Sequence, residues 1–575
     1  MNIIERVAPD EIVKSLQDAG THPLMAKLFA ARGVVQASEL DASLKHLLDP
    51  ESLSGARAAA ARLAQCIASQ EHVCIVADYD CDGATACAVA YLGLKSMGAQ
   101  HVSYIVPDRV NDGYGLTPLI AQRVHALGAK VLMTVDNGMA SFTGVQVAKE
   151  LGLDVIITDH HLPASTTPGA DVIVNPNQRG CNFASKNLAG VGVVFYVLVA
   201  LRTHLRELGH FGEPPTRQPK LDALLPLVAL GTVADVVILD ANNRRLVEQG
   251  LQRMRLGHMP PGIKALLEVA GKEAATLSAQ DLGFVLGPRI NAAGRLSDMS
   301  QGIECLITDD PLKAQALAQA LQDINQSRKG IEVEMKEQAL ELASSLFDDS
   351  DTPPHALCLF DPDFHEGVVG LVASRMKELY HRPTFVFAQS QSPGKEHLLK
   401  GSGRSIPGFH LRDALDLMSK KHPDLILQFG GHAMAAGCTI EEDQLALFEA
   451  AFQHVAHAQL DEQALQMVLL SDGSLGAEHC NWSVGELIKS VVWGQGFLTP
   501  VFVDDFWVLS QKIVGQKHLS MKLKLAAVEL SGIWFGRTEP LGARARLAYR
   551  LECDEWRGQK KLQLMVQGEA PSERS

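Results

Sequence analysis

The sequence predicts an α/β protein organised around a doubly wound parallel sheet. Short apolar runs recur at regular intervals in the first third of the chain, and amphipathic helical patterns lie between them. Strands that alternate with helices indicate a parallel sheet, and continuous apolar runs fit strands buried on both faces. The predicted strands are Val73–Ala77, Val102–Val106, Val131–Val135, Val155–Thr158 and Val172–Val174, and the helices between them include Gly83–Met97, Thr117–Leu127 and Ser141–Leu151.

Composition sets the broad class of protein. A length of 575 residues suggests about three or four domains, and 46% hydrophobic residues allow each of them a core. The N-terminus has no signal-peptide pattern, and the longest apolar stretches are too short to span a bilayer. Ten cysteines without a C-x-x-C pair argue against a zinc ribbon or a disulfide framework. We therefore expect a cytoplasmic protein with reduced thiols and no membrane segment. The net charge of −14 gives no overall nucleic-acid signal.

Carboxylates and imidazoles follow the apolar runs. The carboxyl ends of parallel strands meet at one edge of a sheet, so these side chains are expected to lie together. Unpaired buried charge costs several kcal/mol, and a bound cation removes that cost. The residues are Asp78, Asp80 and Asp82 after the first run, Asp136 after the third, and Asp159, His160 and His161 after the fourth. Asp235 ends the apolar run L-V-A-L-G-T-V-A-D, within a stretch, 224–239, expected to be a buried helix.

The ligand types indicate which metal is bound. Sites rich in oxygen with only one or two imidazoles suit Mn²⁺ or Mg²⁺ better than zinc. The candidate ligands outnumber the needs of one ion, so we expect two ions that share Asp136 as a bridge. Such a pair activates a water molecule for in-line attack on phosphorus. For any one of these aspartates alone, a turn or helix-capping role is an equal alternative; the complete set favours a metal site.

Several arginines are candidates for binding phosphate. Taken singly, each is more often a surface or fold-stabilising residue, and each gains weight only beside the metal site. Arg289, Asn291 and Arg295 belong to R-I-N-A-A-G-R, whose small residues suggest an open backbone. Ser402 and Arg404 belong to G-S-G-R-S, which suggests an anion-binding glycine loop. The other candidates are Arg109, just past a predicted strand end, and His432 in G-G-H.

The remainder of the chain predicts further modules. A heptad-like pattern over 309–347 indicates one long connector helix, and alternating apolar residues after 459 indicate a β-barrel of OB type with added lysine and arginine. The predicted organisation is an N-terminal helical region (1–50), a catalytic domain (51–308), the connector (309–347), a second α/β domain (348–458) and the barrel (459–575).

The motifs A-D-Y-D-C-D-G, V-D-N-G, T-D-H-H, T-V-A-D-V-V, H-E-G-V-V-G, G-S-G-R-S and F-G-G-H resemble those of the DHH phosphoesterases with a DHHA1-type second domain. The resemblance is closest to bacterial exonucleases specific for single-stranded DNA. It implies that Asp80, Asp82, Asp136, His160 and Asp235 bind metal, that Asp78 and His161 are close supports or ligands, and that His161 can act on the scissile phosphate. It also implies that Arg109, Arg295, Ser402 and Arg404 hold the DNA backbone or its 5′-phosphate. Ala77, Cys81 and Ile238 depart from the usual motif residues without removing a ligand.

The expected function is 5′→3′ exonuclease activity on single-stranded DNA in recombination and repair, with release of mononucleotides. The resemblance alone supplies the polarity, and it implies single-strand-binding protein and a helicase as partners of a monomer. One alternative is a phosphatase or nano-RNase acting on short oligonucleotides or cyclic dinucleotides, which needs neither the connector nor the basic barrel. Another is a non-catalytic scaffold on the same fold, which would have lost metal ligands.

Overall fold

The first unit contains the predicted parallel sheet. The computed structural model describes residues 2–109, 112–212, 214, 217–348, 354–556 and 559–570. Its first large sheet has the order β3-β2-β4-β5-β6, with every pair parallel. The strands are β2 (Val73–Ala77), β3 (Val102–Ile105), β4 (Val131–Val135), β5 (Asp154–Thr158) and β6 (Val172–Val174). The predicted fold class and these five strands are confirmed.

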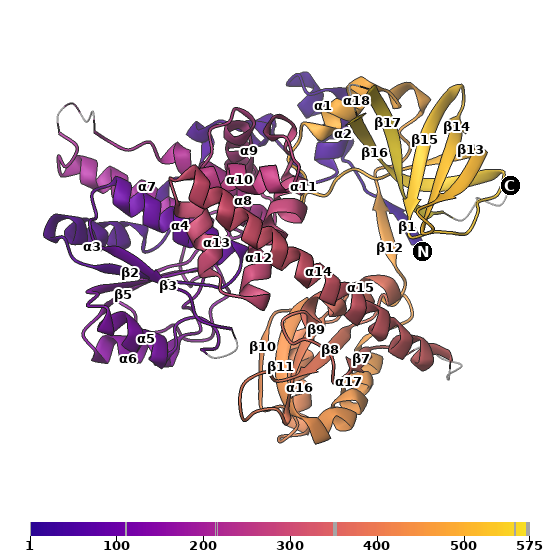
Figure 1. Ribbon diagram of the computed structural model, residues 1–575. Coiled ribbons are helices and arrows are strands. Elements are labelled where there is room, and N and C mark those ends of the chain that lie inside the picture. The colour runs from indigo at the N-terminus through magenta and orange to yellow at the C-terminus, as the bar shows by residue number, and fades with distance from the viewer. Residues whose placement is uncertain are drawn as a thin grey trace.

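Helices cover both faces of this sheet (Figure 1). On one face lie α5 (Pro118–Ala126) and α6 (Phe142–Glu150), which share a core with alternate strand residues such as Val76 and Leu132. The intervening strand residues, such as Ile75 and Met133, join a larger core on the other face. The helices of that face are α3 (Ala56–Ser69), α4 (Cys81–Ser96), α7 (Gly190–Glu207) and α8 (Leu225–Ala234).

The helix expected at 224–239 is shorter than predicted. The segment Leu221–Leu224 is a 3-10 turn, α8 ends at Ala234, and Asp235 follows it. The chain leaves the helix because Val236 adopts a left-handed conformation with φ of 62°. Further helices complete this unit: α9 (Ala241–Arg255), α10 (Pro261–Val269), α11 (Ala279–Asp281), the π-helical η6 (Leu282–Leu286), α12 (Gly287–Leu296) and α13 (Ser300–Ile307).

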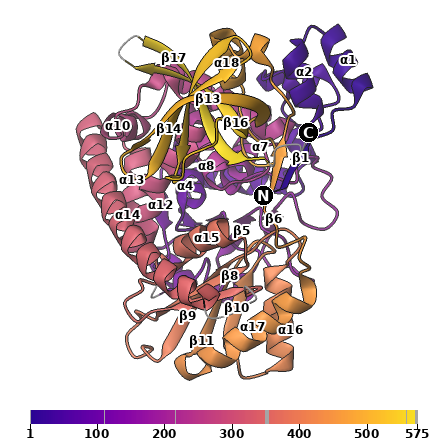
Figure 2. The same ribbon diagram turned by 90° about the vertical axis from the view of Figure 1, so that its right-hand side faces the viewer.

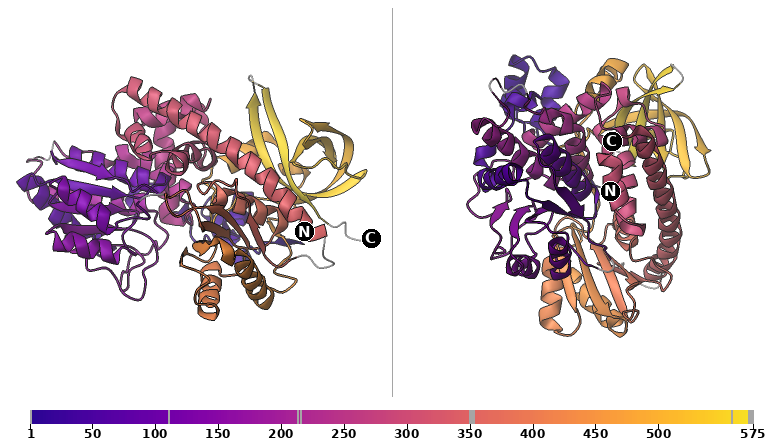
Figure 3. Two further views of the ribbon diagram at one scale, coloured as in Figure 1. Left: turned by 60° about the horizontal axis from the view of Figure 1, so that its bottom comes forward. Right: turned by 60° about the vertical axis from the view of Figure 1, so that its left-hand side comes forward.

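One long helix connects this unit to the second (Figures 1 and 3). The prediction of a helix over 309–347 is confirmed by α14 (Pro311–Asp348), whose 38 residues span about 57 Å. Arg328, which interrupts the apolar seam, is buried and donates hydrogen bonds to Asn325 Oδ1 (2.6 Å) and to Glu332. The polar seam position is therefore satisfied within the helix itself.

The second unit is a mixed sheet with the order β10-β11-β9-β8-β7. Its strands are β7 (Leu357–Phe360), β8 (Thr384–Gln389), β9 (Leu398–Arg404), β10 (Gln428–Gly431) and β11 (Ala435–Glu441), and its helices are α15 (Val369–Tyr380), α16 (Leu411–Lys421) and α17 (Leu445–Gln459). The expected glycine loops at 401–403 and 430–431 are wrong, because these residues lie in β9 and β10. Gly401 and Gly403 leave room for aromatic rings instead: an added Cβ would lie 2.3 Å from Phe387 and 2.6 Å from Phe385.

The C-terminal unit is a closed five-stranded barrel with the order β13-β14-β15-β17-β16, as expected for an OB fold. Its strands are β13 (Phe502–Val514), β14 (His518–Leu525), β15 (Val528–Phe535), β16 (Arg544–Trp556) and β17 (Gln559–Glu569), and α18 (Trp482–Lys489) packs against it. None of the helices in the described ranges is long and apolar enough to cross a membrane.

The N-terminal segment joins the C-terminal half of the chain. We expected residues 1–50 to be helical, but Asn2–Glu5 forms strand β1, which pairs in parallel with β12 (Val468–Ser471). Helices α1 (Asp10–Asp18) and α2 (Pro23–Ala30) follow. The prediction failed at β1 because its partner strand lies near the other end of the chain, where a local pattern carries no information.

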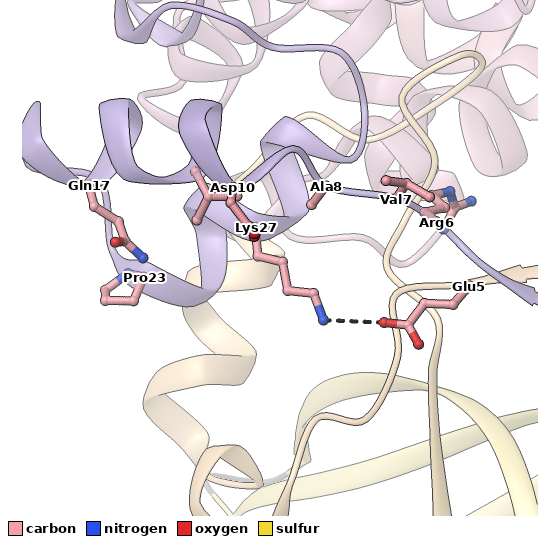
Figure 4. A pocket seen from close by; sticks show the side chains of 9 residues that line it. Glu5, Arg6, Val7, Ala8, Asp10, Gln17, Pro23 and Lys27 are labelled. Atoms are coloured by element: carbon pink, nitrogen blue, oxygen red, sulfur yellow. Dashed lines mark hydrogen bonds and ion pairs between the residues drawn. The ribbon is translucent and has the colours of Figure 1, made fainter.

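An ion-pair network fixes this long-range contact. Asp472, just after β12, is buried and accepts hydrogen bonds from Arg32 Nη1 (2.8 Å), Arg6 Nη1 (3.1 Å) and the Val501 amide (3.0 Å). A cavity of about 520 Å³ lies beside it between β1, α1 and α2. Lys27 reaches across that cavity to Glu5 at 3.4 Å, and both side chains are well exposed (Figure 4).

Asp472→Ala is expected to loosen the N-terminal segment, because the change leaves two arginines without their buried partner. Breaking such a pair costs about 3–5 kcal/mol. Hydrogen–deuterium exchange should show β1 and β12 exchanging much faster than in the unmodified protein. Glu5→Ala, which removes only the exposed pair with Lys27, should change exchange little, since exposed pairs contribute about 0–1 kcal/mol. Equal protection of β1 and β12 in both variants would contradict this role of Asp472.

Candidate metal centre and arginine cluster

The first aspartates lie on the turn between β2 and α4. Asp80 caps α4 by accepting a hydrogen bond from the Gly83 amide at 2.9 Å. Gly83 is required there, since an added Cβ would lie 2.5 Å from the Asp78 carbonyl oxygen. From α12, Asn291 Oδ1 accepts the Cys81 amide at 2.8 Å. Asn291, predicted to bind substrate, therefore holds the metal-ligand turn in place.

Asp82 and Asp136 are positioned by the N-terminus of α7. Asp82 accepts the Gly190 amide at 2.6 Å and the Val191 amide at 2.9 Å, where the helix dipole favours negative charge. Asp136 has a left-handed φ of 61°, which aspartate tolerates. A Cβ on Gly190 would lie 2.6 Å from the Asp136 Cβ, so only glycine lets the two segments approach.

The two histidines have different environments. His160 Nε2 lies 3.1 Å from Asp136 Oδ1 and 3.5 Å from Asp235 Oδ2. His161 Nδ1 is 2.7 Å from Asp159 Oδ1, which also accepts the amides of both histidines. Burial opposes protonation of His161, but this hydrogen bond outweighs it and raises the pKa of His161 to about 9. Asp159 thus orients the imidazole.

The donor set fits divalent cations. Three groups each place ligand atoms within 4.8 Å of one another: Asp78, Asp80 and Asp136; Asp82, His160 and Asp235; and Asp136, His160 and His161. Asp136 Oδ1 and His160 Nε2 are buried and lie 3.1 Å from each other, and within the described residues neither forms a hydrogen bond of acceptable geometry. Burial, with neighbouring carboxylates second, raises the pKa of Asp78 and of Asp82 to about 7 and that of Asp136 well above its usual value. Clustered carboxylates with orphaned oxygens are what a cation would satisfy.

Arginines from both α/β units form a second cluster beside this turn. The Arg109 guanidinium stacks over the Tyr79 ring, 4.3 Å from its centroid. Arg295 Nη1 donates to the Gly367 carbonyl at 3.1 Å, and Arg404 Nη1 donates to Ser402 Oγ at 3.2 Å. Burial, and then Arg109 and Arg404, lowers the pKa of Arg295 to about 9. Within the described ranges none of these arginines forms an ion pair, so the cluster suits an anion.

Two glycines of the H-E-G-V-V-G motif allow the arginines to approach. A Cβ on Gly367 would lie 2.5 Å from the Arg295 carbonyl oxygen, across the boundary between the units. A Cβ on Gly370 would lie 2.8 Å from Ser402 Oγ and 3.0 Å from Arg404 Nη2. The glycines of this motif therefore leave the space that Arg295 and Arg404 occupy. A cavity of about 490 Å³ adjoins the cluster, and its lining includes Tyr79, Arg109, Arg295, His365, Glu366 and Gln391.

The R-I-N-A-A-G-R stretch differs from its prediction. It lies in helix α12, so its small residues do not form an open loop. They provide close packing instead, since a Cβ on Gly294 would lie 2.0 Å from the Tyr79 carbonyl oxygen. Arg289 donates to the Val285 carbonyl at 2.6 Å, one turn back along the chain. This bond directs the Arg289 guanidinium back toward η6, so its predicted contact with substrate stays a prediction.

Two tyrosines at the site escaped sequence reasoning. The Tyr114 ring meets the rings of Tyr79 and His161 edge-on, with centroids 5.8 Å and 6.3 Å away. Its hydroxyl lies 3.4 Å from the Asp136 carbonyl oxygen. The sequence feature that could have identified Tyr79 is its position between two candidate ligands, Asp78 and Asp80. His432, by contrast, was predicted, and its ring stacks on His161 with centroids 5.9 Å apart.

The parallel sheet, its rim of carboxylates and the adjoining arginines define a metal-dependent phosphoesterase fold. Three family profiles match the chain: the DHH family N-terminal domain at residues 72–232, the DHHA1 domain at 354–458 and the RecJ OB domain at 471–568. Single-stranded-DNA-specific exonuclease RecJ of Escherichia coli K12 is 47% identical, over 95% of each chain. The Bacillus subtilis 168 protein of the same name is 32% identical over 99% of this chain and 71% of its own.

Solved structures give the same result. RecJ from Thermus thermophilus in complex with Mn²⁺ superposes with a TM-score of 0.82 at 27% identity, over 100% of this chain and 80% of that one. Exonuclease RecJ bound to manganese gives 0.59 at 32% identity, over 72% and 97%. The chain therefore belongs to the RecJ family of single-stranded-DNA-specific exonucleases.

The metal-free protein should lose stability as the pH rises. The folded-state pKa of Asp78, about 7, exceeds its ordinary value of 3.8, so stability present below about pH 4 is lost as the pH rises toward 7. The raised pKa of His161 acts in the same direction. We expect a lower thermal midpoint in EDTA at pH 7.5 than at pH 5.5, and recovery on addition of Mn²⁺. Asp78→Asn should reduce the pH dependence without abolishing it, because Asp82 and Asp136 keep raised pKa values. An unchanged thermal midpoint in the unmodified protein would contradict the raised carboxylate pKa values.

Proposed function

We propose that this protein is a metal-dependent exonuclease that degrades single-stranded DNA from its 5′ end and releases mononucleotides. One observation carries the proposal: a buried set of carboxylates and imidazoles lies directly beside arginines that form no ion pair within the described ranges. The names of the RecJ relatives support single-stranded DNA as the substrate. The 5′→3′ polarity and a role in recombination and repair follow from the family resemblance.

We propose that two Mn²⁺ or Mg²⁺ ions bind at two of the three groups of candidate ligands. Asp78, Asp80 and Asp136 would hold one ion, and Asp82, His160 and Asp235 the other, with Asp136 close to both sets. The T. thermophilus RecJ structures are complexes with Mn²⁺ and with Mg²⁺, which supports this choice. The chemistry that such ions supply is neutralisation of phosphate charge and activation of water for in-line attack.

The protein's own groups would orient the substrate. His161, kept protonated at neutral pH by Asp159, holds a proton at Nε2 that can be donated to a phosphate oxygen. Arg109, Arg295 and Arg404 would bind the 5′-terminal phosphate, one nucleotide from the bond that breaks. Ser402 contributes its hydroxyl beside Arg404. The aspartates impose negative charge on one side of the strand and the arginines positive charge on the other.

The barrel would bind the strand that enters. Trp507 is half exposed, and the Arg544 guanidinium lies 3.8 Å from its ring centroid. Phe535, at the end of β15, is also exposed. Aromatic rings beside basic groups bind single strands by stacking and charge. A phosphatase or nano-RNase of the same family needs no such module, and a scaffold needs no intact ligand set.

We further propose a cytoplasmic monomer, divided at the predicted boundaries 51–308, 309–347, 348–458 and 459–575, that works with single-strand-binding protein and a helicase. All ten cysteines are free, which supports a reducing compartment. The polypeptide contributes every proposed ligand itself, which supports activity as a monomer.

Asp136→Asn should abolish turnover and leave the fold intact, because the bridging charge is lost while the side-chain shape is kept. The assay follows a long single strand labelled at its 5′ or 3′ end, with Mn²⁺ or EDTA. Early release of 5′-labelled mononucleotide by the unmodified protein, and none by the variant, is expected. Degradation restricted to oligonucleotides of a few residues would support the nano-RNase alternative instead.

Arg404→Ala should weaken recognition of the 5′-phosphate. Loss of a charge-assisted contact is expected to raise KM about ten- to a hundredfold for a 5′-phosphorylated strand, with a smaller effect on a 5′-hydroxyl strand. Arg179→Ala, at an exposed arginine in another part of the catalytic unit, is the matched control. An equal effect on both strands would show that Arg404 does not contact the terminal phosphate.

A further inference from the structure

An exposed apolar patch begins one residue after Asp235. We use the name for four exposed apolar side chains carried by segments that contact one another: Val236, Ile238, Phe284 and Leu498, with exposed fractions of 63%, 46%, 81% and 45%. Three segments distant in sequence supply these side chains: the chain after α8, the π-helical η6 and the loop before the barrel. Large apolar side chains gathered on a surface mark an interaction site more often than single exposed ones do.

Direct contacts hold the three segments together. The Leu239 amide donates to the Gln495 carbonyl at 2.8 Å, and a Cβ on Gly496 would lie 2.6 Å from Ile238. Gln280, one turn before Phe284, lies 3.3 Å from Thr499 Oγ1. On the other side, a Cβ on Gly283 would lie 3.2 Å from Val233, three residues before Val236. The patch is therefore built on packed elements.

The backbone adopts unfavourable conformations to form this patch. Val236 is β-branched yet has a left-handed φ of 62°, where a β-branched side chain is rarely found. Phe284 lies in a five-residue π-helical turn, a feature that is frequent at functional sites. Both side chains remain exposed, while Leu282 and Leu286 of the same turn are buried and the left-handed Val236 ends α8.

The position of the patch indicates its ligand. The arginine cluster adjoins Asp78 and Asp80 through Tyr79, whereas Asp235 groups with Asp82 and His160. Traced from its 5′-phosphate on the arginines toward its 3′ end, a bound strand would cross the metal centre and then pass Asp235. Figure 2 shows the barrel above α8 and α12 and the second sheet below them. The chain after Asp235 contacts the loop before the barrel, where the Leu239 amide donates to the Gln495 carbonyl, so a strand that passes Asp235 would run toward the barrel.

We infer that Phe284, supported by Val236 and Ile238, is a stacking surface for the bases on the 3′ side of the scissile phosphate. The inference rests on the proposed function and identifies a substrate contact of that site. The sugar–phosphate chain would follow the polar metal centre while the bases lie against the apolar patch. Base stacking is sequence-tolerant because every base has an aromatic face, as an enzyme that degrades any sequence requires.

The test measures binding without turnover. A 5′-phosphorylated strand with a 3′ fluorophore is titrated in EDTA, and fluorescence anisotropy gives Kd for the unmodified protein, Phe284→Ala and Phe284→Tyr. Phe284→Ala is expected to bind about five- to a hundredfold more weakly, and Phe284→Tyr to recover most of the affinity. Leu312→Ala is the matched control, because Leu312 on α14 is also 81% exposed.

A second strand separates stacking from other effects. It carries abasic sugars behind its terminal nucleotide, so it offers phosphates without bases. The unmodified protein should bind it more weakly than the normal strand, and Phe284→Ala should weaken it no further, as expected for two changes that remove one interaction. Unchanged binding of the normal strand by Phe284→Ala, or an equal loss on both strands, would overturn the inference. Absence of exonuclease activity in the unmodified protein would instead refute the proposed function.

Discussion

Mutual repulsion among buried carboxylates is the constraint on which this structure depends. Asp78, Asp82 and Asp136 are buried at one edge of the parallel sheet, and burial raises the pKa of each. Ionised together, they are tolerable only with compensating charge. The fold supplies part of it through fixed dipoles, most directly where the N-terminus of α7 meets Asp82. The remainder calls for cations, so metal binding and stability are linked in the same residues.

The arginine cluster has the opposite electrostatic problem, repulsion among positive charges. Its arginines come from two units, so contacts between the units offset that repulsion. Arg109 and Arg295 come from the first unit and Arg404 from the second, and their repulsion favours separation unless an anion joins them. The hydrogen bond that Arg295 Nη1 donates to the Gly367 carbonyl links the two units without that anion. Since α14 connects the two units, its length sets the distance between the second sheet and the turn between β2 and α4. The glycines of H-E-G-V-V-G then allow close approach where side chains would prevent it.

The sequence was sufficient wherever the determining contacts are local. Continuous apolar runs predicted the strands of the parallel sheet, and the rule that strand ends share an edge brought Asp78, Asp136 and His160 together. The failures share a physical cause: each depends on a contact or a conformation that no local pattern encodes. Strand β1 needs β12, the glycines of β9 need the phenylalanines of β8, and the turn at Asp235 needs a left-handed Val236. Asn291 lies beside Cys81 only because α12 packs on α4, which no pattern within either segment reveals.

The role of Asp159 illustrates how geometry refines a count of ligands. In the sequence it precedes two histidines and looks equivalent to the other aspartates. In the structure its Oδ1 accepts hydrogen bonds from the His160 and His161 amides and from the His161 ring, and its Oδ2 accepts the Met139 amide. A carboxylate occupied in this way orients His161 and is less available as a metal ligand than the other aspartates. The ligand sets that remain are small for ions that prefer about six oxygen or nitrogen positions. Ions held by so few protein ligands would leave room for water and a phosphate oxygen, as a catalytic metal site needs.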